Sequence, residues 1–116
     1  MVMNNNHFAE IAGTNKRTFE VAAMGAFQLT DTPALADVFT PDVEVASYGS
    51  IADMVEKVDY YLARPELRAE MAQKARRRAI DEHTFAHRWA AKMDVLGLEV
   101  PPTFPVQRSQ LKVRAQ

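Results

Sequence analysis

Hydrophobic residues make up 47% of the 116-residue chain and charged residues 25%, a balance typical of one globular domain. The formal net charge of −1 excludes a strongly basic surface for nucleic acid or an anionic membrane, and the lack of cysteine excludes disulfides and thiolate chemistry. No apolar run approaches the ~20 residues that a membrane-spanning helix needs, so we expect a small cytoplasmic protein with neither a membrane span nor a nucleic-acid partner.

The first half of the sequence predicts short strands that alternate with helices. Residues 1–13 begin with a polar, asparagine-rich stretch, so we expect a flexible segment there and no signal peptide. A helix then begins after Thr14 or Asn15, which are both good N-caps, and ends at Gly25, which suits the left-handed residue that terminates many helices. Two strand candidates follow at residues 26–30 and 44–48, with a short helix expected between them at residues 34–39.

The second half predicts three helices, each with one apolar face. The first is capped by Ser50, the second begins at Pro65, and the third is capped by Thr84 and ends at Gly97. Residues 98–116 contain three prolines and little apolar periodicity, which predicts a mobile tail. We expect the core to contain the apolar faces of the three helices, namely Met54, Val55, Val58, Tyr61 and Leu62, then Leu67, Met71, Ala75 and Ala79, and then Phe85, Trp89, Met93 and Leu96.

This order of elements predicts an α/β fold with a parallel sheet and a helical C-terminal half. Two strands alone make a poor parallel sheet, because such sheets usually have several strands and are covered by helices on both faces. An exposed strand edge also invites pairing with another chain. We therefore expect a chain that is either part of something larger or paired with a second copy of itself.

The densest part of the sequence has residue types that suit a nucleoside diphosphate. Lys16 and Arg17 lie in the first turn of the first helix, where free backbone N–H groups already favour phosphate. Two cations in that turn oppose the helix dipole and gain little unless an anion joins them. Glu20 follows one turn later and can accept hydrogen bonds from both hydroxyls of a ribose. Thr30 and Asp31 end a strand, and ligands of open α/β sheets lie just beyond the strand ends.

The same segment resembles the donor-binding domain of GT-B glycosyltransferases, and in particular the CgeB-like (spore-maturation-like) group 1 transferases. That group reads Asn-x-Arg-x-Phe-Glu-x-x-Ala-x-Gly-Gly/Ala-Phe-x-Leu-Thr-Asp. The resemblance extends over roughly residues 14–96 and includes Glu82-His83-Thr84-Phe85 near its end. The matching positions of the motif are Asn15, Arg17, Phe19, Glu20, Ala23, Gly25, Ala26, Phe27, Leu29, Thr30 and Asp31.

The resemblance implies that residues 14–97 form a partial Rossmann-like domain that holds a nucleoside-diphosphate sugar. Glu20 matches the glutamate that contacts the ribose in the family, and Asn15 and Arg17 would lie near the diphosphate or the sugar. Positive groups and a helix N-terminus stabilise the leaving diphosphate in such enzymes, so neither a metal nor a cofactor is expected. The donor-binding residues that the resemblance implies are Asn15, Arg17, Glu20, Gly25, Thr30 and Asp31.

Two departures from the family bear on activity. Many relatives carry an acidic residue eight positions before the ribose glutamate, and this chain has Ala12 there. The acceptor-binding half of the family, which would supply the general base, has no counterpart in this sequence. We therefore expect no sugar transfer by this chain alone, no identifiable catalytic residue, and a partner that is either a second chain with the missing half or a second copy. The alternative is a non-catalytic interaction module that self-associates through its sheet edge.

Several features keep simpler interpretations open. Glu20 could be an ordinary exposed helix residue that compensates Lys16 one turn earlier. Lys16 and Arg17 could themselves be a plain solvated pair. The run of arginines at 76–78 suggests a nucleic-acid patch, but consecutive helical residues spread around the helix, and a solvated face is the simpler interpretation. His83 and His87 have the spacing of a zinc pair, yet no third ligand is evident and Thr84 would interrupt the helix between them.

Overall fold

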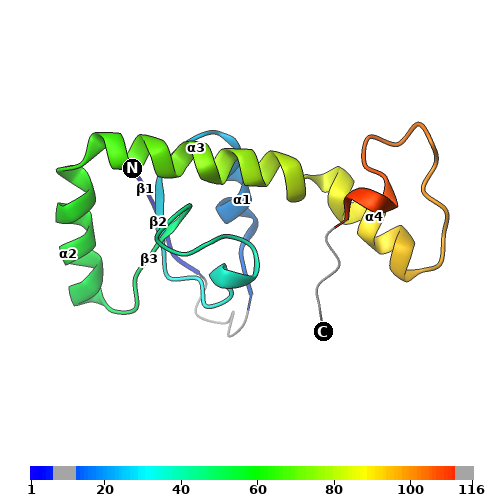
Figure 1. Cartoon of the computed structure of the whole chain (residues 1–116). Coiled ribbons are helices and arrows are strands. Elements are labelled where there is room, and N and C mark those ends of the chain that lie inside the picture. Colours follow the sequence, from blue (N-terminus) through cyan, green and yellow to red (C-terminus); the bar gives the residue numbers. More distant parts are fainter. Residues whose placement is uncertain (7–12, 112–116) are drawn as a thin grey trace. The chain divides into compact units, whose positions relative to one another are not determined.

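The computed structural model describes residues 1–6 and 13–111 (Figure 1). The described chain divides into two compact units, Met1–Arg78 and a second unit that begins at Ala79. In chain order, the elements are β1 (Val2–Asn4), α1 (Lys16–Ala23), β2 (Gln28–Thr30), the 3-10 helix η1 (Leu35–Asp37), β3 (Ala46–Ser47), α2 (Ile51–Leu62), α3 (Pro65–Glu82), α4 (Phe85–Val95) and the 3-10 helix η2 (Arg108–Gln110).

The first unit contains a small open sheet of three parallel strands in the order β1-β2-β3. The α/β fold with short parallel strands is therefore confirmed. The structure differs from the flexible start expected for residues 1–13, because Val2–Asn4 pair with Gln28–Thr30, and Val2 N donates to Phe27 O at 2.9 Å. Hydrophobic alternation could not reveal this strand, since its most buried side chain is the amide of Asn4.

The two faces of β2 carry different chemistry. Phe27 and Leu29 point into an apolar core formed with α2 and α3, and each large side chain that is fully buried there contributes ~1.5–3 kcal/mol. Gln28 and Thr30 alternate to the other face, where Gln28 Nε2 donates to Thr18 O of α1 at 2.8 Å. The apolar core contains Phe27, Leu29, Ala46, Tyr61, Met71 and Ala72, with Tyr48, Met54, Val58 and Leu67 packed against it.

Several of the expected helix boundaries have the local geometry that explains them. Gly25 has a φ of +74° after α1, which confirms the predicted left-handed end. Gly97 has a φ of +69° after α4, so the helix ends at this glycine as expected. The side chain of Ser50 accepts a hydrogen bond from the backbone N–H of Asp53, and Thr84 caps α4 in the same way. These caps satisfy N–H groups that the first turn of a helix leaves without partners.

In the second unit, the expected core face of α4 is wrong. Phe85 is 82% exposed and Trp89 55%, whereas His87 and Ala90 form the buried side of the helix. The residues after Gly97 provide the reason, since Val106 is only 5% exposed and η2 contacts α4. The stretch expected to be a mobile tail thus contains a short helix and a buried side chain as far as residue 111. Among the described residues, no helix is long and apolar enough to cross a membrane.

Candidate functional site

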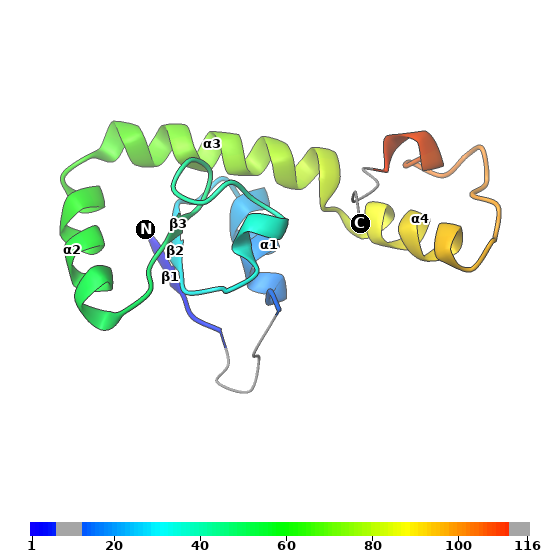
Figure 2. The same ribbon diagram turned by 60° about the horizontal axis from the view of Figure 1, so that its bottom comes forward.

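One edge of the sheet collects the ends of all three strands, and we call it the carboxyl edge. β1 ends there at Asn4, β2 at Thr30 and β3 at Ser47. The N-termini of α1 and α2 lie on the same side in both views (Figures 1 and 2). Because the strands are parallel and each of these helices follows a strand, their positive dipole ends meet at the edge where open α/β sheets bind ligands.

The start of α1 is anchored by a buried network of amides. Asn4 is fully buried, and its Nδ2 lies 3.1 Å from Thr18 Oγ1 and 3.3 Å from both Asn15 Oδ1 and Gln28 Oε1. Asn15 Nδ2 donates in return to Asn4 Oδ1 at 3.0 Å, while Asn15 Oδ1 caps the backbone N–H of Thr18 at 3.1 Å. Asn15, a predicted donor-binding residue, therefore holds the first turn of α1 in place.

A second polar cluster joins the ends of β1 and β2. The Thr30 and Thr32 hydroxyls lie 2.9 Å apart, and Thr32 Oγ1 donates to Asn6 Oδ1 at 3.2 Å. The carboxylate of Asp31 accepts the backbone N–H of Asn6 at 2.8 Å. Thr30 is fully buried, whereas Asp31 is exposed, so of these two predicted site residues only Asp31 faces solvent at the edge.

The charged residues of α1 are exposed to solvent. Lys16 and Arg17 occupy the first turn, which contains no acidic residue, and Glu20 lies one turn further along. Within the described part of the chain, none of the three forms an ion pair. Glu20 is thus an exposed helix residue, as the simpler interpretation expects, although it forms no ion pair with Lys16 among the described residues. Ala12, the position of the family's other acidic residue, lies outside the described residues.

Gly25 lies at the opposite end of α1 from the carboxyl edge. It lets the chain turn from the helix into β2, and a Cβ atom at this position would lie 3.3 Å from Cδ of Arg76. The structure therefore brings Asn15, Arg17 and Asp31 to one side of the sheet and leaves Gly25 at the other, where its backbone conformation explains the residue type.

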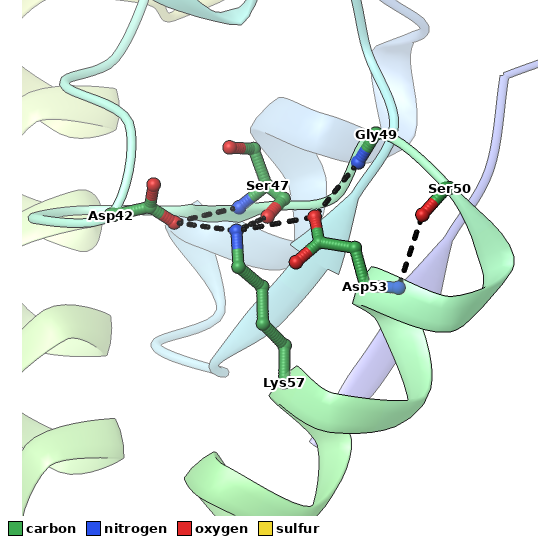
Figure 3. Close-up of polar contacts among 6 residues, drawn as sticks. All are labelled: Asp42, Ser47, Gly49, Ser50, Asp53 and Lys57. Atoms are coloured by element: carbon green, nitrogen blue, oxygen red, sulfur yellow. Dashed lines mark hydrogen bonds and ion pairs between the residues drawn. The ribbon is translucent and has the colours of Figure 1, made fainter.

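The loop of residues 47–50, which runs from the last residue of β3 to the N-cap of α2, completes the carboxyl edge (Figure 3). Tyr48 N donates to Thr30 O at 3.0 Å, which fastens the loop to the end of β2. Burial, and secondarily the negative charge of Asp31, raises the pKa of the Tyr48 hydroxyl. The loop, Asn4, Thr18 and Gln28 were not among the predicted site residues, because buried polar side chains leave no mark in the apolar periodicity of a sequence.

The edge is electrostatically uneven. Two cations, Lys16 and Arg17, lie at the start of α1, whereas Asp53 lies in the first turn of α2 and pairs with Lys57 at 3.6 Å. An anion such as a diphosphate fits the α1 end, where the helix dipole and the cations act together. Hydroxyl groups of a sugar suit the exposed carboxylate of Asp31, which accepts hydrogen bonds.

His83 and His87 lie in different parts of the backbone. α3 ends at Glu82 and α4 begins at Phe85, so His83 and His87 do not share one helix. His87 Nδ1 lies 2.6 Å from Thr84 Oγ1 and accepts the Thr84 N–H at 3.2 Å, which completes a capping box. No group of three or more His, Asp or Glu side chains that could hold a metal ion occurs within residues 1–6 and 13–111.

The sequence profile of a family described as glycosyl transferase-like matches residues 1–94, and the chain belongs to this family. The spore protein CgeB of Bacillus subtilis (strain 168) is 38% identical to the chain over 74 residues. That match covers 64% of this chain and 22% of the relative, so the chain spans well under half of the length of CgeB. No solved structure matches the chain.

Proposed function

We propose that this chain is the nucleotide-sugar-binding portion of a glycosyltransferase, with the donor at the carboxyl edge. The observation that carries the proposal is the start of α1: two exposed cations and the positive end of the helix, with no acidic residue in the first turn. Membership of a glycosyl transferase-like family also supports a role in glycosyl transfer. Arg17 and the first-turn N–H groups would hold the diphosphate, and Glu20 would accept hydrogen bonds from the ribose.

We propose that transfer of the sugar to an acceptor needs a larger assembly than the described residues. The proposed role of the described residues is to bind the donor and to stabilise the diphosphate as it leaves. The acceptor site and its general base would come from elements that the described residues do not include. We therefore expect the described residues to bind the donor, and turnover only where those elements are also present.

Calorimetric titration with UDP, GDP, UDP-glucose and GDP-mannose tests the proposal. We expect saturable binding of at least one of these nucleotides, and Glu20→Ala should weaken it by ~1–3 kcal/mol because a charged hydrogen bond is lost. Glu70→Ala is the matched control, since Glu70 is exposed on α3 and pairs with Lys74 at 2.7 Å. Absence of binding by the wild-type chain at millimolar ligand would contradict the proposal.

An alternative function is a non-catalytic module that self-associates through its sheet. The observation in its favour is the strand order, since β1 and β3 each have a single neighbour among the described strands. Open parallel edges can pair with a second copy. Light scattering separates the two functions: a stable dimer that binds none of the four nucleotides would favour the module.

A further inference from the structure

Lys57 of α2 lies at the centre of a cluster that holds the loop of residues 47–50 (Figure 3). Its Nζ is 3.7 Å from Asp42 Oδ1 and 3.6 Å from Asp53 Oδ2, and it also donates to Ser47 O. The Lys57 side chain is 27% exposed, against 49% for Asp42 and 37% for Asp53. The ammonium group of Lys57 therefore contacts two carboxylates and one carbonyl, which belong to the segment before β3, the end of β3 and α2.

The carboxylates of Asp42 and Asp53 each accept a hydrogen bond from the backbone of the loop. Asp42 Oδ1 accepts the backbone N–H of Ser47 at 3.1 Å, and Asp53 Oδ2 accepts that of Gly49 at 3.0 Å. Without the ammonium group of Lys57, two negative charges would face each other across the loop, and like charges repel. Asp42 also has a φ of +59°, an uncommon conformation for a residue other than glycine, which surrounding contacts must hold in place.

The loop held in this way belongs to the carboxyl edge. The N–H of Tyr48, at its centre, donates to Thr30 O at the end of β2. Asp31 comes directly after Thr30 in the sequence, and after burial its negative charge is the second cause that raises the pKa of the Tyr48 hydroxyl. A displacement of the loop would therefore change the wall of the edge beside Asp31, and unneutralised carboxylates there would repel an incoming diphosphate.

We propose that Lys57 is a positioning residue for the donor site: it fixes the loop of residues 47–50 against the end of β2 and neutralises Asp42 and Asp53. This inference rests on the proposed function, because it assigns the loop to the site that binds the nucleotide. Lys57 acts through the loop and does not itself contact the donor. A cation at this position is required, whereas the length of the side chain is secondary.

Two measurements test the proposal, one without ligand and one with it. In Lys57→Met, hydrogen exchange of the Tyr48 amide should accelerate at least about fivefold, since the loop loses its attachment. Affinity for the tightest binder among UDP, GDP, UDP-glucose and GDP-mannose should fall about five- to tenfold. Lys57→Arg should restore most of both, because it retains the charge, and a merely structural loss of fit would not be rescued by the bulkier side chain.

Lys74→Met is the matched control, since Lys74 forms an exposed ion pair with Glu70 on α3. It should leave the exchange rate and the affinity unchanged. Should Lys57→Met fail to fold, Asp53→Asn provides the second variant. It keeps an acceptor for Gly49 N–H and removes one of the two ion pairs of Lys57, so it should accelerate exchange of the Tyr48 amide about two- to threefold. An unchanged exchange rate in this variant would overturn the positioning role.

The outcomes separate the inference from the proposed function. Wild-type binding with an unchanged affinity in Lys57→Met would overturn the positioning role and leave the donor site intact. An unchanged exchange rate of the Tyr48 amide would overturn it even if no nucleotide binds. Faster exchange in a chain whose wild type binds none of the four probes would overturn the donor role together with the proposed function.

Discussion

Two helices begin at the carboxyl edge, and they begin in opposite ways. α2 is capped by Ser50 and has an acidic residue, Asp53, in its first turn, which complements the helix dipole. α1 is capped by Asn15 and has Lys16 and Arg17 where an acidic residue would be stabilising. The first turn of α2 therefore follows the preference for acidic residues at a helix N-terminus, whereas the first turn of α1 does not. Such departures are expected at functional sites, because an anion from outside can supply the missing negative charge.

The largest effect is expected from removal of the network that anchors α1. Asn4→Leu should lower the free energy of unfolding by ~3 kcal/mol, because Asn15, Thr18 and Gln28 lose buried hydrogen-bond partners. Chemical denaturation measures this value. Asn5→Leu is the control, since Asn5 is exposed and should change stability by less than ~0.5 kcal/mol. A loss as small as that of the control would show that the network contributes little.

Charge reversal at Arg17 should separate binding from stability. Arg17→Glu should weaken nucleotide binding by ~1.5–3 kcal/mol, as expected for loss of a charged hydrogen bond to phosphate. The same change should raise the free energy of unfolding by ~0.3–1 kcal/mol, since an acidic residue then complements the dipole of α1. Calorimetry and denaturation measure the two effects.

Arg77→Glu reverses an exposed charge on α3 and provides the comparison for that experiment. It should leave the nucleotide affinity unchanged. Parallel losses of affinity in both variants would mean that only the net charge of the chain matters, and that the start of α1 is not a specific anion site.

A smaller effect is expected at the start of α2. Asp53→Ala removes the acceptor of Gly49 N–H and the acidic residue of the first turn, and should cost ~1 kcal/mol of stability. Amide exchange should accelerate at Gly49 but not at Thr18 of α1, because the two helix starts are held by separate networks. Equal acceleration at both amides would contradict that separation.

The smallest effect is expected at high pH. The pKa values of Tyr48 and Tyr61 are both raised above 10.0, and burial is the largest cause in each case. The folded state therefore keeps these phenols neutral at a pH at which they begin to ionise in the unfolded chain. Their contribution is fully present below pH 10 and is lost as the pH rises through the raised values. Tyr48→Phe should lessen the loss of stability measured by denaturation between pH 9 and ~11, and the double variant with Tyr61→Phe should lessen it further. An unchanged pH profile in the double variant would contradict this.

Sequence patterns predicted most of the first unit. The parallel α/β order, the left-handed Gly25, the cap at Ser50 and the buried Tyr61 all follow from local chemistry or helical periodicity, and the structure bears them out. For α1 the sequence offers Thr14 and Asn15 as caps, and the structure has Asn15. The resemblance that pointed to glycosyltransferases is confirmed at the level of the family. The donor-binding roles of Arg17 and Glu20 remain predictions.

Local patterns were less informative where partners come from far along the chain. β1 was hidden because Asn4 is buried by hydrogen bonds to residues 11 to 24 positions away. The stripe of Phe85 and Trp89 was assigned to the core, yet the other side of α4 is the buried one. Periodicity identifies an apolar face, but it does not say which side another segment covers.

The sequence by itself determined where most helices begin and end and where β2 and β3 lie, because caps, glycines and apolar spacing act within a few residues. The motif at residues 15–31 indicated the family. Tertiary structure decided that Asn4, Asp31 and the loop of residues 47–50 meet at one edge, and that Lys57 joins Asp42 to Asp53. Hydrogen bonds and ion pairs between distant residues depend on how the chain folds back on itself. No short stretch of sequence contains that information.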